Sequence, residues 1–319
     1  MKKILTLLAL FISFIMNAQL TAVTEGGNTG QRLSTSNASN HGNIGSDAVD
    51  LSVQSLASST RGATGFKAVA MGSNTTASGS ISTAIGNANE ASGTFSTSMG
   101  VSTLASGYGS TSMGNYTVAN GWHSTAMGSN TTASGSYSTA IGLYATASDY
   151  SSTVIGQHNS SGSSVTNNAT SFSTSNTAFV IGNGENSDNK SDAFKVMFDG
   201  TTTIAGDLTI NSDARLKANI TSLGGTLAKL LKIDGKSYTM KKDQSEKQKI
   251  GLLAQDIQKV FPELVLESQG IKSVNYQGLV PVIINALKEQ DRKMKEQDRK
   301  MREQEERLER LERLVANMD

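Results

Sequence analysis

The sequence has no cysteine and only two prolines among its 319 residues. Without cysteine no disulfide can stabilise the fold, and oligomerisation is the obvious substitute. Hydrophobic residues make up 37% and aromatic residues 5% of the chain, which argues against one conventional large core. The formal net charge of +1 gives no general reason to expect nucleic acid as a partner.

Charged residues are nearly missing from one half of the chain. Residues 20 to 185 are almost uncharged and rich in Ser, Thr, Gly, Asn and Ala, whereas residues 213 to 319 hold most of the Lys, Arg, Asp and Glu. The sequence also contains no metal-ligand cluster, no nucleotide-binding loop and no recognisable pair of carboxylates. We therefore expect two unlike segments, no metal or other cofactor, and no enzyme acting on an external substrate.

The N-terminus has the pattern of an export signal. Lys2 and Lys3 precede an apolar run over residues 4–16, and small residues follow it. The run is too short for a comfortable membrane span, although an uncleaved anchor is the alternative. We predict a signal peptide over residues 1–18, a secreted or cell-surface location, and no stable transmembrane anchor later in the chain.

A repeat of 14 residues dominates the uncharged half. An aliphatic residue followed by glycine recurs at Met71, Ile85, Met99, Met113, Met127, Ile141 and Ile155. A unit of this length suits one coil of a β-solenoid with two short strands. We expect the aliphatic residue and one or two small residues to point inward, and the glycines to supply positive φ angles. A disordered Ser/Gly-rich linker, the alternative, would have no reason to keep this phase.

The repeat resembles a known family. Ser-Thr-Ala-Ile-Gly at residues 82–86 and Ala-Ser-Gly at 91–93 resemble the head repeats of YadA-type trimeric autotransporter adhesins, over about residues 70–157. The resemblance implies a left-handed parallel β-roll in a homotrimer, with a host or matrix protein as ligand. The Asn- and Thr-rich faces of the head add a glycan as a candidate ligand. Four aromatic residues are candidate contacts for a ligand, or ordinary exposed or packed residues of variable repeat positions: Tyr108, Tyr116, Trp122 and Tyr137.

Segments on either side of the regular repeats are less periodic. Residues 19–60 are a polar segment, either a degenerate cap or a loose stretch. The repeat head is predicted over residues 61–186, with a loop at 158–176 and a last coil near 178–182. Two alternating stretches around Asp199-Gly200 predict a β hairpin or stem over residues 187–211.

The charged half begins as a small α+β module over residues 212–285. We expect helical structure from Ser212 through Leu231, a strand at 236–240, an amphipathic helix at 250–261 stopped by Pro262, an extended segment at 274–276, and a long helix from near 278–281.

Three motifs of this module resemble the intramolecular chaperone domain of phage endosialidases and tail fibres. They are Ser-Asp-Ala-Arg-Leu-Lys at 212–217, Gly-Leu-Leu-Ala-Gln-Asp-Ile-Gln-Lys-Val-Phe-Pro-Glu-Leu at 251–264 and Val-Asn-Tyr-Gln-Gly-Leu-Val-Pro at 274–281. The resemblance implies a domain that trimerises, aligns the upstream β-fibre and cuts itself off once. By position, Ser212 would be the nucleophile, Lys217 the base, and Asn211–Ser212 the broken bond.

Lysine is a demanding base for this chemistry. It serves only where burial or a neighbouring cation lowers its pKa. A spacing of five is not a helical neighbour relation, so Ser212 must precede the helix or reach the lysine of another chain. In the alternative interpretation Ser212 or Asp213 is an N-cap and Lys217 is solvated.

The last segment, residues 286–319, has a heptad pattern. Apolar residues occupy position a at Leu287, Met294, Met301, Leu308 and Val315, and position d holds Gln290, Gln297, Gln304, Leu311 and Met318. Positions g and e carry opposite charges, as in a parallel in-register coiled coil. A solvated single helix is the alternative. The whole sequence predicts a trimeric adhesin-like fibre; the alternative is a tail-fibre-like structural protein that keeps its trimerisation domain.

Overall fold

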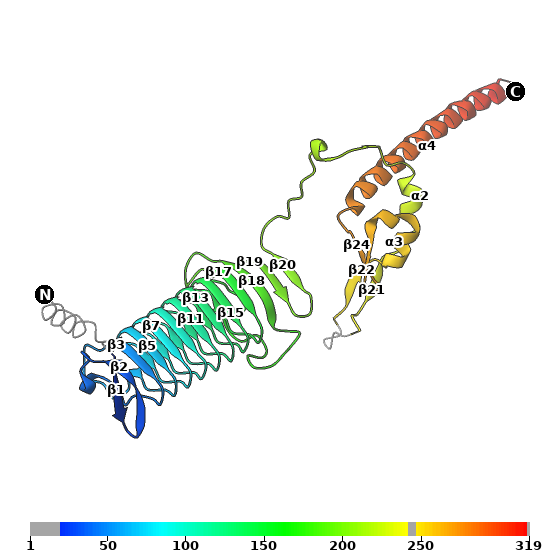
Figure 1. Cartoon of the computed structure of the whole chain (residues 1–319). Helices are drawn as coiled ribbons and strands as arrows, with labels where there is room; N and C mark the ends of the chain where they lie inside the picture. The colour runs from blue at the N-terminus through cyan, green and yellow to red at the C-terminus, as the bar shows by residue number, and fades with distance from the viewer. Residues whose placement is uncertain (1–19, 242–246, 318–319) are drawn as a thin grey trace, which may run out of the picture. The chain divides into compact units, whose positions relative to one another are not determined.

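The computed structural model describes residues 20–241 and 247–317, so the predicted signal peptide lies outside it (Figure 1). The chain divides into two compact units, one ending at Thr209 and the other beginning at Ile210. Within the described ranges, no helix combines the length and the hydrophobicity that spanning a membrane would require.

The first unit is a β-solenoid in which each coil has one long and one short strand, as the 14-residue period predicts (Figure 1). The long strands form one sheet in the order β1 (Leu20–Glu25), β2 (Asn28–Leu33), β3 (Val49–Val53), β5 (Val69–Ser73), β7 (Thr83–Asn87), β9 (Thr97–Val101), β11 (Thr111–Asn115), β13 (Thr125–Ser129), β15 (Thr139–Leu143), β17 (Thr153–Gln157), β18 (Thr177–Asn183), β19 (Asp192–Met197) and β20 (Thr202–Ile204). The short strands form a second sheet of β4 (Gly62–Ala63), β6 (Thr76–Ala77), β8 (Glu90–Ala91), β10 (Leu104–Ala105), β12 (Val118–Ala119), β14 (Thr132–Ala133) and β16 (Thr146–Ala147).

Neighbouring coils stack in parallel with equivalent residues paired. Met113 of β11, for example, lies opposite Met99 on one side and Met127 on the other. This register places every repeat position in a straight row along the solenoid. The predicted parallel β-roll is therefore confirmed.

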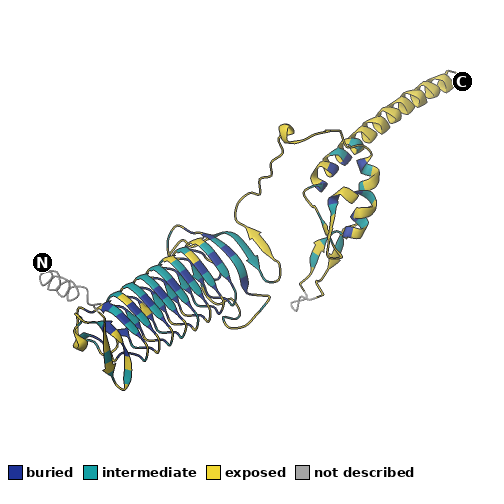
Figure 2. Ribbon diagram, viewed as in Figure 1, coloured by how far each residue is buried: buried dark blue, intermediate teal, exposed yellow. Residues whose placement is uncertain are grey.

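The inward direction of the aliphatic residues was predicted wrongly. The residue before each one is fully buried inside the coil, in a row of Ala70, Ala84, Ser98, Ser112, Ala126, Ala140, Val154 and Val180. Side chains alternate along a strand, so the aliphatic residue that follows must point outward. Met71 keeps 41% and Ile141 40% of its surface exposed. The coil interior therefore takes mainly small side chains, and the larger ones point outward. Figure 2 shows the buried positions recurring from strand to strand along the solenoid.

The glycines do two different things. Those after the aliphatic residues have positive φ, as predicted; Gly114 has φ 128°. Those of the second row, such as Gly107, are not among the positive-φ residues, but a Cβ there would overlap the carbonyl oxygen of Gly121 in the next coil. The second row is therefore required by close packing of backbone on backbone.

The ends of the solenoid are closed by irregular coils. At the N-terminal end β1 and β2 form a hairpin, η1 (Ala38–Asn40) follows, and β2 pairs with β3 in parallel. The polar N-terminal segment is therefore a cap on the solenoid and not a loose stretch. At the other end β18 stacks on β17 in the coil register after the loop, so the predicted last coil is present. β18, β19 and β20 then continue as antiparallel strands.

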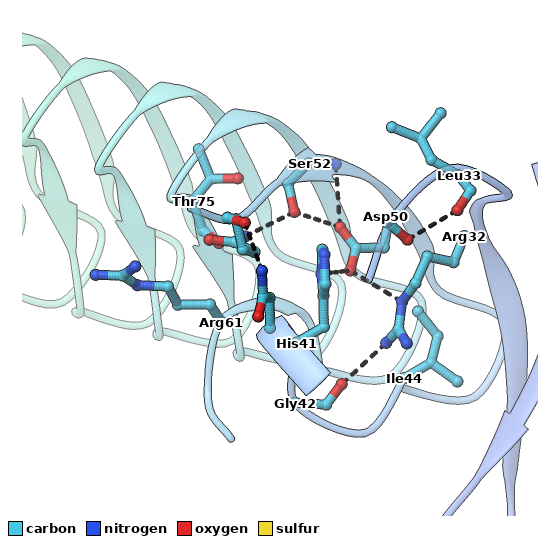
Figure 3. Close-up of polar contacts among 12 residues, drawn as sticks. Arg32, Leu33, His41, Gly42, Ile44, Asp50, Ser52, Arg61 and Thr75 are labelled. Carbon is cyan, nitrogen blue, oxygen red and sulfur yellow. Dashed lines mark hydrogen bonds and ion pairs between the residues drawn. The ribbon is translucent and has the colours of Figure 1, made fainter. Parts of the chain in front are cut away.

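A buried ionic cluster holds the N-terminal cap together (Figure 3). Asp50 is fully buried, accepts a hydrogen bond from His41 Nδ1 at 2.8 Å and pairs with Arg32 Nε at 3.5 Å. Arg32 also pairs with Glu25 and donates to the carbonyl oxygen of Gly42. Burial would raise the pKa of Asp50, but hydrogen bonds from His41 and Ser52 outweigh it and lower that pKa.

We expect Asp50→Asn to cost about 3–5 kcal/mol of head stability, because it breaks a buried ion pair and leaves Arg32 undercompensated. Since the pKa of Asp50 is lower in the folded state, its ionisation stabilises the head above the unfolded value of about 3.9 and ceases to do so as pH falls through the folded value. Urea unfolding at several pH values would measure both effects.

Asp47→Asn is the control, because Asp47 is exposed and the same charge is lost. Acid sensitivity below about pH 4 should diminish in Asp50→Asn and persist in Asp47→Asn. Equal behaviour of the two variants would contradict a structural role for the cluster.

The second unit is a small α+β domain ending in a long helix. Its elements are η2 (Ala214–Leu216), α2 (Thr226–Leu230), β21 (Lys236–Tyr238), β22 (Lys249–Gly251), α3 (Ala254–Val260), η3 (Pro262–Leu264), β23 (Val265–Ser268), β24 (Ile271–Val274) and α4 (Leu279–Ala316). Ile257, Phe261, Leu264, Leu279 and Val282 form its core.

Two predicted elements of this unit are wrong in extent. The helix expected from Ile250 begins only at Ala254, because β22 pairs with β21 through the preceding residues. The helix expected from Ser212 onward is limited to one short turn and α2. Asn219 and Gly225 adopt positive φ, which no right-handed helix contains, and they interrupt it.

The long helix α4 begins at Leu279, as predicted. Its predicted a-position residues are largely exposed in the single chain, from 54% for Met294 to 63% for Val315 (Figure 2). The predicted d-position residue Met318 lies outside the described residues. The coiled coil stays a prediction.

Candidate active site

The predicted catalytic residues flank one turn of 3₁₀ helix, η2. Asp213 is its N-cap, with extended backbone and a side chain that accepts a hydrogen bond from the backbone N–H of Arg215 at 2.8 Å. Lys217 is the C-cap and is again extended. The chain therefore folds back over a single turn between Ser212 and Lys217.

This turn brings the two predicted residues together. Lys217 Nζ donates a hydrogen bond to Ser212 Oγ at 2.7 Å. In the single chain, Ser212 precedes the helical turn and contacts the lysine of its own chain. Asp213 is the N-cap, as the alternative interpretation predicts for one of the two residues. The Lys217 amine contacts the Ser212 hydroxyl.

Arg215 is the cation nearest to Lys217 in sequence, but its charge is balanced. Its guanidinium pairs with the carboxylate of Asp213, 2.7 Å apart at the closest atoms. The hydrogen bond from the Arg215 side chain, and then that from its backbone, lowers the pKa of Asp213. Arg215 therefore supports the turn and leaves no unbalanced cation beside Lys217.

Burial is absent from the single chain. Ser212, Lys217 and the residues around them are exposed, and Arg215 has 89% of its side chain accessible. Among the described residues no group of three or more His, Asp or Glu side chains is placed to hold a metal ion. Chemically, the pair is a nucleophile and a potential base in hydrogen-bond contact, without the dry surroundings that a lysine base needs.

One contact that sequence reasoning missed joins α2 to α4 in the same unit. The carboxylate of Glu289, on α4, accepts hydrogen bonds from both N–H and Oγ of Thr226 and from the N–H of Leu227. The backbone N–H groups of Thr226 and Leu227 and then the Thr226 hydroxyl lower the pKa of Glu289. Glu289 thus caps α2 from 63 residues away, and no local sequence signal could show this.

Comparisons with known proteins match one segment in each of the two units of the chain. Six overlapping segments between residues 63 and 159 match the YadA head domain repeat, and residues 212–266 match the chaperone of endosialidase. The chain thus joins a trimeric-adhesin-type head to a tail-fibre-type chaperone domain, and both resemblances are confirmed. The second match begins at Ser212, the predicted nucleophile.

One curated relative is a phage protein. The chain is 31% identical over 100 residues to the long tail fiber protein Gp37 of Escherichia phage AR1, which covers 28% of this chain and 9% of the relative. The chain therefore matches less than a tenth of that fibre's length. No solved structure matches the chain.

Proposed function

We propose that the chain is one of three in a parallel trimeric fibre, exported to the cell surface or beyond, with an adhesin-like head and a C-terminal domain that drives assembly. The observation that carries this proposal is the outward aliphatic row on the long-strand sheet. We call it the aliphatic row: Met71, Ile85, Met99, Met113, Met127, Ile141, Ile155 and Ile181.

The aliphatic row has the properties of an interface between copies. It is continuous along the stacked coils, partly exposed, and flanked by small uncharged side chains such as Thr111 and Thr125. Exposed apolar surface of this extent marks an interaction site in soluble proteins. Because every row is straight, three identical sheets can bury it around one axis without changing register.

Two further segments support a parallel trimer. Ile204, Leu208 and Ile210 are 43%, 62% and 56% exposed in the stem, and residues 205–211 are assigned to no strand. The a-position residues of α4 are exposed along one helix. Three chains aligned by these segments would lower the entropic cost of nucleating a fold rich in non-local pairs.

Self-cleavage is the finer part of the proposal. The 2.7 Å contact between Lys217 Nζ and Ser212 Oγ supports it, and the missing burial suggests that packing of three chains completes the site. The Ser212 hydroxyl would attack the carbonyl carbon of Asn211 and give its proton to Lys217. Lys217 would then protonate the departing Ser212 nitrogen, and water would hydrolyse the resulting ester. Release of residues 212–319 would leave the head kinetically trapped.

A second candidate function is a tail-fibre-like structural protein that keeps its trimerisation domain. One observation favours it: both Ser212 and Lys217 are exposed, so the pair lacks the dry surroundings that a lysine base needs. The two candidates share the trimer and differ in whether the chain is cut.

We expect Met113→Lys to convert the trimer to monomers, because it places three like charges beside the proposed axis. The coil itself should fold, since Met113 points away from the coil interior. Sedimentation of the mature chain and circular dichroism measure the two properties separately.

Tyr116→Lys is the matched control. Tyr116 is 59% exposed at a corner between strands, outside the aliphatic row, and the same charge is added. A wild-type chain that sediments as a monomer would contradict the proposed function, and a Met113→Lys trimer would place the interface elsewhere.

A further inference from the structure

A second row of large side chains follows one edge of the solenoid, at the turns that lead from each short strand to the next long strand. We call it the aromatic strip, and it comprises Phe95, Tyr108, Trp122, His123, Tyr137 and Tyr150. Adjacent ring centroids lie 5.3 to 5.5 Å apart without interruption over five successive coils.

The rings of the aromatic strip are accessible. Phe95 is 48%, Tyr108 38%, Trp122 52% and Tyr137 46% exposed, whereas the serines that follow them in the turns are buried. Rings in such contact stabilise one another by about 0.5–1.5 kcal/mol per pair. This stabilisation explains why the rings contact one another. It does not explain why rings stand at an exposed surface.

The fold does not require aromatic residues at these turns. Tyr108 and Trp122 occupy a repeat position that holds Ser80 and Ser136 in other coils. Tyr137 occupies a position that holds Ser151 in the next coil, and both residues have positive φ and the same backbone hydrogen bond to the preceding coil. Serine therefore builds the same turn, and the choice of rings has another cause.

The side chains around the aromatic strip restrict the chemical class of ligand that it can bind. No Asp, Glu, Lys or Arg occurs from residue 91 to 148, so no permanently charged side chain of this stretch is available to pair with a strongly charged ligand. The strip offers apolar ring faces together with the Tyr hydroxyls, the Trp N–H and surrounding Ser and Thr hydroxyls. A sugar ring has the complementary character, with an apolar C–H face and a polar hydroxyl edge.

The spacing favours a linear polymer. Stacked strands are about 4.8 Å apart, so the strip presents one ring site per coil at that interval. An extended polysaccharide repeats one sugar ring at a similar interval. A polyproline-type peptide advances about 3.1 Å per residue and would not match one ring per coil.

We propose that the aromatic strip binds a neutral, extended polysaccharide along the long axis of the head. This inference deepens the proposed adhesive function and rests on it, naming a glycan as the ligand of the head. Sugar rings stack on successive aromatic rings while their hydroxyls bond to the polar edges of the strip.

The single tryptophan of the chain lies in the strip and reports on it directly. We would titrate the full mature chain with soluble neutral glucans and xylans, and with a proline-rich peptide, and record Trp122 emission together with retention in affinity electrophoresis. A glucan or xylan should shift the emission and retard the protein.

Variants taken from the chain's own repeats test the assignment. Tyr108→Ser and Tyr137→Ser should each weaken polysaccharide binding about three- to tenfold, and the double variant about 30-fold, as expected for lost ring contacts. Tyr116→Asn, on an exposed tyrosine outside the strip whose position holds Asn130 in the next coil, should bind as the wild type.

Several outcomes would overturn the inference. These are no response to any neutral polysaccharide, equal binding by all variants, ring-dependent binding of the peptide alone, or loss of the trimer in the double variant, which would make the strip a contact between chains. Sedimentation in the same samples separates these outcomes from failure of the proposed function, because a trimer without glycan binding removes only this inference.

Discussion

Ser212→Ala is expected to leave the chain whole, whereas the wild type splits between Asn211 and Ser212. Without the hydroxyl no ester can form, so the loss should be complete. Intact mass spectrometry of the purified mature chain before and after assembly measures it directly. The Ser212 side chain is exposed and hydrogen-bonds only to Lys217 among the described contacts, so folding and trimer size should not change.

Lys217→Arg distinguishes the role of Lys217 as a base from its role as a hydrogen-bond donor to Ser212. Arginine keeps the positive charge and can donate to Ser212, but it cannot lose its proton in a protein. Loss of a general base typically slows a reaction about 10²- to 10⁴-fold, and this variant should therefore assemble and remain largely uncut.

The controls identify each alternative. Asp213→Asn weakens the pair with Arg215 but keeps an N-cap acceptor, so slower cleavage there would reflect the geometry of the turn. A wild type that stays whole but trimeric would favour the permanently retained domain. Cleavage of Ser212→Ala at the same bond would show that another protease cuts this exposed stem.

The head could be predicted from its sequence because its structure repeats with its sequence. A constant 14-residue step fixes which residues are neighbours, and Met99, Met113 and Met127 do pair across three strands. The step does not say which face of each strand is the coil interior. Alternation requires only that Ser112 and Met113 face opposite ways, and the tight coil settles the choice in favour of the smaller side chain.

The C-terminal unit was harder to predict because its elements are short. The apolar run from Ile250 to Leu253 fits a helix or a strand equally well. Only pairing with residues 236–238, distant in sequence, makes its first two residues part of a strand. The contact between Ser212 and Lys217 depends on a single 3₁₀ turn with an Asp213 cap. The sequence motif identified both residues as candidates, but the contact between their side chains could not be predicted from the spacing.

The aromatic strip was partly visible in the sequence. Tyr108, Trp122 and Tyr137 stood out as single residues, but they alternate between two adjacent repeat positions and so follow no strict period. His123 links them in space, with centroid distances of 5.3 Å to Tyr108 and 5.5 Å to Tyr137. Continuity of the strip depends on the pitch of the coils, which a linear reading does not supply.

Gly114→Ala should be among the most damaging single changes in the head. Gly114 has φ 128°, and a Cβ there would overlap the carbonyl oxygen of Gly128 in the next coil. The backbone strain alone costs about 1–3 kcal/mol. Forcing β11 and β13 apart also breaks ladder hydrogen bonds, so we expect a total above about 4 kcal/mol per chain, the range of exceptional substitutions.

Substitutions at two other glycines measure the backbone strain and the steric overlap separately. Gly200 has φ 86° but open space around it, so Gly200→Ala carries the backbone strain alone, about 1–3 kcal/mol. Gly107 is not among the positive-φ residues and lies under the carbonyl of Gly121, so Gly107→Ala carries the overlap alone. Urea unfolding of the three variants should give Gly114→Ala the largest loss. A Gly114→Ala loss no greater than that of Gly200→Ala would mean that the coils can separate without cost, and close backbone stacking would then not be what holds this solenoid together.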